Sequence, residues 1–406
     1  MQANAPRSAL RVAPVACLAV VVLLGLAIMA CGKVPGPAGG PSDPPLPTAG
    51  VAPGLLDTRL NPSEPGGDHT RAAIREDTQQ LHAAWMRIDV LWSGVEPAPG
   101  RYDRAQLARL DRFVSEIHAA GANVLLTVRD VPQWASDSSY WSHPPAGFSP
   151  GYEPFYPMTP AALPRLGDFA AMLARRYAGK VQALECWNEP NLWAFFYPQR
   201  TTGDPDFAAH TYLHMLQAFS AGVRRAGTGM QVVAGSTAAF GTNDKLGTSP
   251  QRFAGYLAQH GAASLFDVYS HHAYTPGGSV NRAPGAIPDR PAITVTLGNL
   301  GTLLRLFPAK PFYITEYGYN TQPSVYFGWF AVSEAKQASY LRRAFAIAAR
   351  YPQIRLLIWY LVVDEPGAPA DDGVYTGLRR SNGARKPSWQ AFARVGNAYA
   401  RAQARK

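Results

Sequence analysis

The chain has 406 residues, of which 47% are hydrophobic and only 16% are charged. This length and composition suit one large folded domain or two medium ones, and they exclude a disordered chain, a coiled coil and a small disulfide-dependent domain. The formal net charge is +10, but the lysines and arginines are scattered through the sequence. The charge therefore does not by itself predict a nucleic-acid partner.

The N-terminal residues have the pattern of an export signal. Arg7 and Arg11 precede an apolar run, residues 12–30, that contains no charged residue. The run ends in the letters IMACG, which resemble a bacterial lipobox with Cys31 as the lipidated residue. We predict that residues 1–31 are a signal peptide with a lipobox-like end. A retained membrane anchor and a simply cleaved signal stay open as alternatives, and all three place the rest of the chain outside the cytoplasm.

The signal is followed by a spacer and then by the body of the protein. Residues 32–50 are rich in proline and glycine and have no apolar period, as expected of a linker. Residues 51–406 are predicted to form a single catalytic domain. Cys186 is the one cysteine of this body, so a disulfide within it and a cysteine-based zinc site are both excluded.

Short apolar runs alternate with amphipathic stretches throughout this body. The predicted strands are 85–92, 123–128, 181–187, 231–236, 266–272, 311–317 and 354–363, preceded by a weaker one within 51–60. The predicted helices are 70–83, 103–120, 161–178, 204–223, 251–260, 290–307, 333–348 and 387–400, the fourth starting at Asp204-Pro205-Asp206. Eight such units predict an α/β fold, a closed (β/α)₈ TIM barrel. An open doubly wound sheet is the alternative, but no GxGxxG motif follows the first strand to support it.

Two glutamates stand at the ends of predicted strands, where a barrel carries its catalytic residues. Glu189 follows the strand 181–187 within the letters NEPN, and Glu316 ends the strand 311–317. A carboxylate in such an apolar neighbourhood is costly unless it is paired. An arginine-paired structural role is the alternative for each glutamate alone. Two together suit glycoside hydrolysis, which needs one protonated and one ionised carboxyl group.

Four segments resemble motifs of glycoside hydrolase clan A, the retaining TIM-barrel glycosidases. They are residues 85–103, 185–191, 266–274 and 313–321, and the resemblance extends from about residue 54 to 396. Within the clan, the chain most resembles glycoside hydrolase family 39, and family 5 shares most of these features. The resemblance implies a retaining mechanism without a metal or an organic cofactor.

The resemblance also implies roles for individual residues. Glu189 matches the general acid/base and Glu316 the nucleophile. Asn188 matches the asparagine that binds the sugar 2-hydroxyl, and Tyr274 matches the residue that holds the nucleophile. Arg87 matches the arginine that pairs with the nucleophile and keeps its pKa low, with a structural ion pair at the bottom of the barrel as the alternative.

Three further side chains are expected at the site. By the same resemblance, Trp359 matches the aromatic floor of the −1 subsite. His272 is either a site residue or a hydrogen-bonded core histidine. Trp134 is the strongest candidate among the aromatic residues of the loops, which either stack on sugars or pack against one another. Asp89 is assigned a structural role.

The expected substrate is an extracellular oligo- or polysaccharide. The long aromatic loops favour an open groove and internal cleavage, with an exo-acting β-glycosidase as the alternative. A non-catalytic carbohydrate-binding barrel is the competing class, although it would usually lack one of the two glutamates. Nucleic-acid binding is not expected, because the sequence shows neither a basic helix nor a stacking motif. We expect a monomer that touches the membrane only through its N-terminus.

Overall fold

The structure of the protein is a computed structural model that describes residues 50–63, 69–275, 283–324, 331–367 and 373–406. The predicted signal and all of the linker except residue 50 lie outside these residues. Among the described helices, none has both the length and the apolar character needed to cross a membrane.

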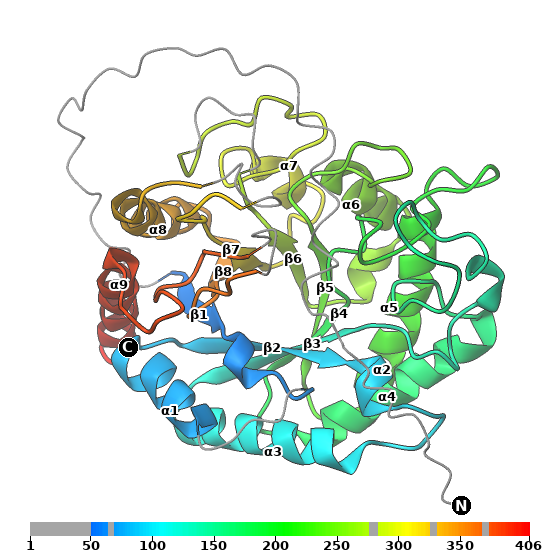
Figure 1. Cartoon of the computed structure of the whole chain (residues 1–406), viewed down its shortest axis with the longest axis horizontal. Coiled ribbons are helices and arrows are strands. Elements are labelled where there is room, and N and C mark those ends of the chain that lie inside the picture. Colours follow the sequence, from blue (N-terminus) through cyan, green and yellow to red (C-terminus); the bar gives the residue numbers. More distant parts are fainter. Residues whose placement is uncertain (1–49, 64–68, 276–282, 325–330, 368–372) are drawn as a thin grey trace, which may run out of the picture.

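Eight parallel strands close into a barrel in their order along the chain (Figure 1). The strands are β1 (Ala52–Leu56), β2 (Trp85–Leu91), β3 (Asn123–Arg129), β4 (Ala183–Cys186), β5 (Gln231–Thr237), β6 (Val268–His272), β7 (Phe312–Tyr317) and β8 (Ile354–Tyr360). Pairing of β8 with β1 closes the ring. The prediction of a (β/α)₈ TIM barrel is confirmed, including the weak first strand.

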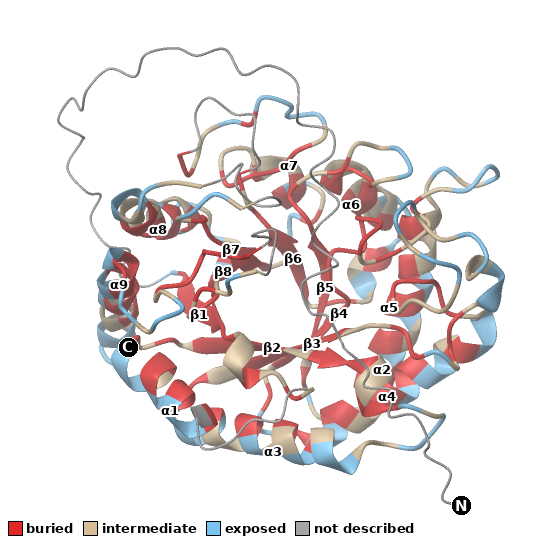
Figure 2. Ribbon diagram, in the orientation of Figure 1, coloured by how far each residue is buried: buried red, intermediate tan, exposed pale blue. Residues whose placement is uncertain are grey.

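Helices surround the barrel. The α-helices are α1 (His69–Arg75), α2 (Trp92–Val95), α3 (Arg104–Ala119), α4 (Leu163–Arg176), α5 (Phe207–Ala226), α6 (Pro250–Gln259), α7 (Gly301–Leu304), α8 (Glu334–Ala348) and α9 (Pro387–Gln403). Shorter 3₁₀ or π turns are η2 (Thr58–Leu60), η3 (Glu76–Gln80), η4 (Ser138–Tyr140), η5 (Pro160–Ala162) and η6 (Ala262–Ser264). Their inner faces are buried and their outer faces are exposed (Figure 2).

Two of the helix predictions were wrong in extent. The helix predicted over 290–307 is reduced to the single turn α7, because side chains bond the backbone just before it: Asn299 Oδ1 accepts from Thr296 N at 2.8 Å. Helix α5 begins at Phe207, not near Asp204. The Asp204 carboxylate instead accepts from the backbone of Asp206 at 2.9 Å, in a turn that precedes the helix.

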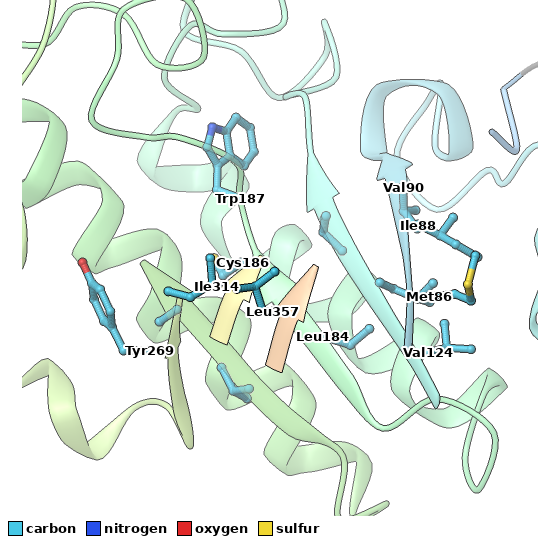
Figure 3. Close-up of a cluster of buried hydrophobic side chains, with 14 of the residues drawn as sticks. Met86, Ile88, Val90, Val124, Leu184, Cys186, Trp187, Tyr269, Ile314 and Leu357 are labelled. Carbon is cyan, nitrogen blue, oxygen red and sulfur yellow. The ribbon is translucent and has the colours of Figure 1, made fainter. Parts of the chain in front are cut away.

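Strand side chains alternate between two buried layers. Met86, Ile88 and Val90 of β2 point away from the barrel axis into the layer shared with the helices (Figure 3). Below the carboxyl ends of the strands the barrel interior is apolar, and its residues there include Leu125, Ala183, Val233, Val268 and Leu356. Polar side chains replace these at the carboxyl ends of the strands, so the interior changes character toward the catalytic face.

Candidate active site

Arg87 is the centre of a buried hydrogen-bond network. Its guanidinium donates to Glu316 Oε1 at 2.7 Å, to Asn188 Oδ1 at 2.8 Å and to Glu185 Oε2 at 3.0 Å. It also donates to Thr127 Oγ1 at 2.9 Å, and the arginine itself is 1% exposed. The predicted pairing of Arg87 with the candidate nucleophile is therefore present in the structure, and the same group orients Asn188.

Sequence reasoning missed Glu185 and Thr127. Thr127 Oγ1 donates to Glu185 Oε2 at 2.7 Å, and both side chains are fully buried. One signal was available: a glutamate inside an apolar strand needs a cationic partner, and Arg87 lies in another strand. We assign the pair a supporting role, because a buried guanidinium needs compensating negative charge.

An irregularity in β7 turns Glu316 inward. Tyr313 faces the barrel interior and Ile314 faces the helices, so strict alternation would send Glu316 outward. The register between β7 and β8 shifts between Ile314 and Tyr317, and this extra step brings Glu316 back to the inside. A bulge thus aims the candidate nucleophile.

Glu316 is held by donors on both carboxylate oxygens. Besides Arg87 at Oε1, the Tyr274 hydroxyl donates to Oε2 at 3.1 Å, and His272 Nδ1 lies 3.5 Å from Oε2. Burial raises the pKa of Glu316 above its ordinary value, and the interactions with His272 and with the Arg87 charge only partly offset this rise. Arg87 lowers this pKa, as expected, but desolvation outweighs the attraction, so the net shift is upward.

Glu189 has fewer hydrogen-bond donors around its carboxyl group than Glu316, and its pKa is shifted further. Burial raises its pKa to about 8, with Arg87 the charge that opposes the rise. Its backbone has a φ of 43°, and its N–H donates to Ser236 O at 2.9 Å. Trp187, two residues earlier, also has a positive φ of 72°, which is costly for a bulky side chain. The chain is therefore strained as it leaves β4 and presents Glu189.

His272 joins the two glutamates. Its Nδ1 is 2.8 Å from Glu189 Oε1, and its Nε2 is 3.2 Å from Ser236 Oγ. Burial lowers the pKa of His272, so the ring is neutral. His271 faces the other way and bonds Thr237 and a backbone carbonyl. The structure thus brings the predicted His272 into the site and adds Ser236, for which the sequence held no signal.

Trp359 does not face the site. It is fully buried in the layer between strands and helices, where its indole N–H donates to Thr376 O at 2.9 Å. Its prediction as the floor of the −1 subsite was wrong, since Leu356 and Ile358 point inward and alternation sends Trp359 outward. Tyr360 is the inward-facing aromatic residue of β8, and its ring lies 6.4 Å from that of Tyr274.

Trp134 serves the packing of its loop. Its ring meets Trp92 edge-on at 5.5 Å, and its indole N–H donates to Glu96 O at 2.8 Å. Other loop aromatics also pack on one another, as Phe148 does with Phe155 and Trp193 at 5.3 and 5.8 Å. These contacts favour small loop cores. Sugar stacking by Trp134 stays a prediction. Tyr326, Phe327, Trp329 and Phe330 lie outside the described residues.

Glu189, His272 and Glu316 also offer the donor set of a metal site. One ligand atom from each lies within 4.8 Å of the others, and all three residues are buried. Among the residues that the structure describes, this is the one group of three that meets that criterion. Imidazole and two carboxylates suit several divalent cations. The same closeness of the two carboxylates is also what a double-displacement glycosidase requires.

Comparison with known proteins agrees with this geometry. Residues 57–361 match the family described as Cellulase (glycosyl hydrolase family 5). No curated protein matches the chain.

Solved structures share the fold at low sequence identity. A family 39 glycoside hydrolase from Bacteroides cellulosilyticus WH2 is 21% identical over 86% of this chain and 64% of its own, with a TM-score of 0.58. The exo-beta-1,4-mannosidase Op5Man5 from Opitutaceae bacterium strain TAV5 is 16% identical over 87% of this chain and 60% of its own, with a TM-score of 0.55. A GH5_18 protein from Bifidobacterium longum subsp. infantis is 17% identical over 86% of this chain and 79% of its own, with a TM-score of 0.61.

The chain thus spans less than two thirds of the first two of these structures. The likeness to a family 39 enzyme agrees in fold with the family 39 resemblance, whereas the family match is to family 5. Both families belong to the clan that the motifs predicted. The chain belongs to glycosyl hydrolase family 5, a family of clan A.

Proposed function

We propose that the protein is a retaining glycosidase that cleaves O-glycosidic bonds of an extracellular polysaccharide by double displacement. The observation that carries the proposal is the closeness of Glu189 and Glu316, which have ligand oxygens within 4.8 Å. Retaining enzymes hold their carboxyl groups about 5–5.5 Å apart, and inverting enzymes about 6.5–9.5 Å. A water molecule needed for inversion would have little room between this pair.

The different surroundings of the two glutamates support the division of roles. Glu316 receives hydrogen bonds from Arg87 and Tyr274, which favour its ionised form and suit a nucleophile. Glu189 is protonated near neutral pH, because its pKa is raised to about 8. It therefore suits the acid that protonates the leaving oxygen.

The reaction then has two steps. In the first, a Glu316 oxygen bonds to the anomeric carbon while the glycosidic bond breaks and Glu189 gives its proton to the leaving oxygen. In the second, Glu189 takes a proton from water, the water oxygen bonds to the anomeric carbon, and the ester to Glu316 breaks. Asn188, held by Arg87, is positioned to donate through its amide to the sugar 2-hydroxyl.

Replacing each glutamate by alanine tests the roles. Glu316→Ala should lower kcat/KM by about 10⁴-fold or more on every substrate, the scale of losing a nucleophile. Glu189→Ala should lose about 10²–10⁴-fold on poor leaving groups and much less on 2,4-dinitrophenyl glycosides, which need no acid. Unchanged rates in both variants, or first-formed product of inverted configuration by NMR, would refute the proposal.

We further propose internal cleavage of the polysaccharide. The measurement is the release of reducing ends by residues 51–406 from a panel of mannan, glucan and xylan, with viscosity followed in parallel. Endo-action predicts that viscosity falls early, whereas an exo-acting enzyme releases monosaccharide at nearly constant viscosity. Glycan binding without any release of reducing ends would indicate the non-catalytic barrel instead. Activity should persist in EDTA, since no step uses a metal.

A further inference from the structure

A carboxylate oxygen of Asp89 stands without a hydrogen-bond partner at the reacting centre. Asp89 follows Arg87 by two residues on β2, so both side chains face the barrel interior, with Asp89 nearer the catalytic face. Its Oδ2 accepts from Arg129 Nε at 2.9 Å. Its Oδ1 is buried and accepts no hydrogen bond from any described residue.

This oxygen and the candidate nucleophile have a common neighbour in Arg87. Arg87 Nη1 is 3.7 Å from Asp89 Oδ1 and 2.7 Å from Glu316 Oε1, so one nitrogen atom is in ion-pair range of both carboxylates. The charges of Arg87 and Arg129 lower the pKa of Asp89, which is therefore ionised and purely an acceptor. A buried, ionised oxygen without a donor is costly to leave unpaired.

Geometry and chemistry indicate which donor fills this place. The Asp89 side chain is 30% exposed although its Oδ1 is covered, so a molecule that enters the site can reach the carboxylate group and would meet Oδ1 once the side chain shifts. The carboxylates Asp89 and Glu316 share one guanidinium group, so a sugar attacked by Glu316 lies within reach of Asp89. A sugar brings hydroxyl donors into that space, and a hydrogen bond from a hydroxyl to a carboxylate is of the strong, charge-assisted kind.

The charge around the site restricts the sugar further. Arg87 has Glu185 and Glu316 as ion-pair partners, and Arg129 contacts Asp89 and, at 2.7 Å, Asp130. Both arginines are thus committed to acids within the described part of the site. A sugar carboxylate placed beside Asp89 would meet a like charge, and the two arginines that contact Asp89 already have other acidic partners.

We propose that Asp89 binds the sugar in the −1 subsite by accepting one or two of its hydroxyl groups, and that this subsite takes a neutral sugar and rejects a uronic acid. The inference rests on the proposed function and names the substrate class of that same site. It assigns to Asp89 a binding role where sequence reasoning had placed a structural one.

Kinetics with 4-nitrophenyl β-glycosides test the assignment. The probes are mono- and disaccharides of glucose, mannose and xylose, together with the glucuronide as the charged probe. Asp89→Asn keeps the shape but weakens the acceptor, so kcat/KM on the best neutral probe should fall about 10–100-fold, as for loss of a hydrogen bond to a charged group. The wild type should hydrolyse the glucuronide at least about 10-fold less well than neutral probes, the least cost of one uncompensated charge.

Monodeoxy versions of the best probe separate binding from a structural effect. The analogue that lacks the contacted hydroxyl should be cleaved about equally by wild type and Asp89→Asn, because the interaction is then absent from both. Asp130→Asn is the matched control, since it removes the same charge from the same arginine, and its kcat/KM should stay within about 3-fold. Thermal unfolding of both variants checks their folding.

Two results would overturn the inference while leaving the glycosidase proposal intact. The first is an active wild type with Asp89→Asn unchanged on every neutral probe. The second is a preference for the glucuronide. Loss of activity in Asp89→Asn that is the same on every deoxy analogue would assign Asp89 a structural role and likewise reject the inference. An inactive wild type would instead reject the proposed function.

Discussion

At the scale of single residues, Glu189 links the structure to a pH profile. Its carboxyl must be protonated to act as the acid, and burial raises its pKa to about 8. The protonated form is lost as pH rises through that value, so kcat/KM should fall on the alkaline side near pH 8. Glu316 must be ionised, and because its pKa is also raised, activity should fall on the acid side above the usual glutamate range.

Glu189→Gln provides the control for this profile. With a 2,4-dinitrophenyl glycoside, whose departure needs no acid, the variant should keep the acid limb of kcat/KM and lose the alkaline limb. An alkaline limb that persists in Glu189→Gln would assign that limb to another group.

Ser236 controls Glu189 through His272. When Ser236 Oγ–H donates to Nε2, His272 carries its proton on Nδ1 and donates it to Glu189 Oε1. The catalytic proton then resides on Oε2. Ser236→Ala removes the hydrogen bond that fixes the His272 tautomer. We therefore expect kcat/KM to fall about 3- to 10-fold, the value of one hydrogen bond, and the alkaline limb of the pH profile of kcat/KM to move.

The backbone of Ser236 offers a second, matched variant. Its φ of 42° is strained for serine but free for glycine. Ser236→Gly should therefore lose as much activity as Ser236→Ala while unfolding at a higher urea concentration than Ser236→Ala. Equal activity of wild type and both variants would remove Ser236 from the site.

At the scale of elements, helices α4 and α5 meet through two glycines. A Cβ built on Gly222 would lie impossibly close to the carbonyl oxygen of Gly167, so the backbones are in direct contact. Gly222→Ala must push the helices apart and should cost about 1–3 kcal/mol of unfolding free energy, measured by urea denaturation. Gly255 is the control, because nothing lies within 4 Å of its added Cβ. Gly255→Ala should be neutral or stabilising by up to about 1 kcal/mol, and equal losses in both would contradict the contact.

Elements also explain what the sequence could and could not predict. The strand runs and the glutamates at two strand ends were enough for the barrel and for the position of Glu189 and Glu316. The prediction for Trp359 failed because β8 beyond Arg355 is apolar on both faces, so its pattern does not say which residues point inward. Glu316 faces inward only through a register shift in β7, and Ser236 lies within another in β5, next to Gly235 at a φ of 102°. Such bulges leave little trace in a single sequence.

At the scale of the whole molecule, the barrel explains both the position of the candidate site and the low polarity of its surroundings. Apolar side chains fill the lower interior, so the polar network around Arg87 rests on a water-poor floor. This low-polarity support is what raises the pKa values of both glutamates and strengthens the hydrogen bonds to them. The position of the site and the raised pKa values of its two glutamates thus have one cause, the layering of apolar and polar side chains inside the barrel.

The N-terminal part of the chain carries the sequence pattern that bears on where this barrel would act. We propose that residues 1–31 direct export and that Cys31 carries a lipid, with residues 32–50 as the spacer. Cys31→Ser should then abolish incorporation of labelled palmitate in a bacterial host. Cys17→Ser, in the same apolar run, is the matched control and should be labelled like the wild type. Labelling of none of the three proteins, with all of them in the membrane fraction, would indicate an uncleaved anchor, and a soluble unlabelled wild type would indicate a cleaved signal.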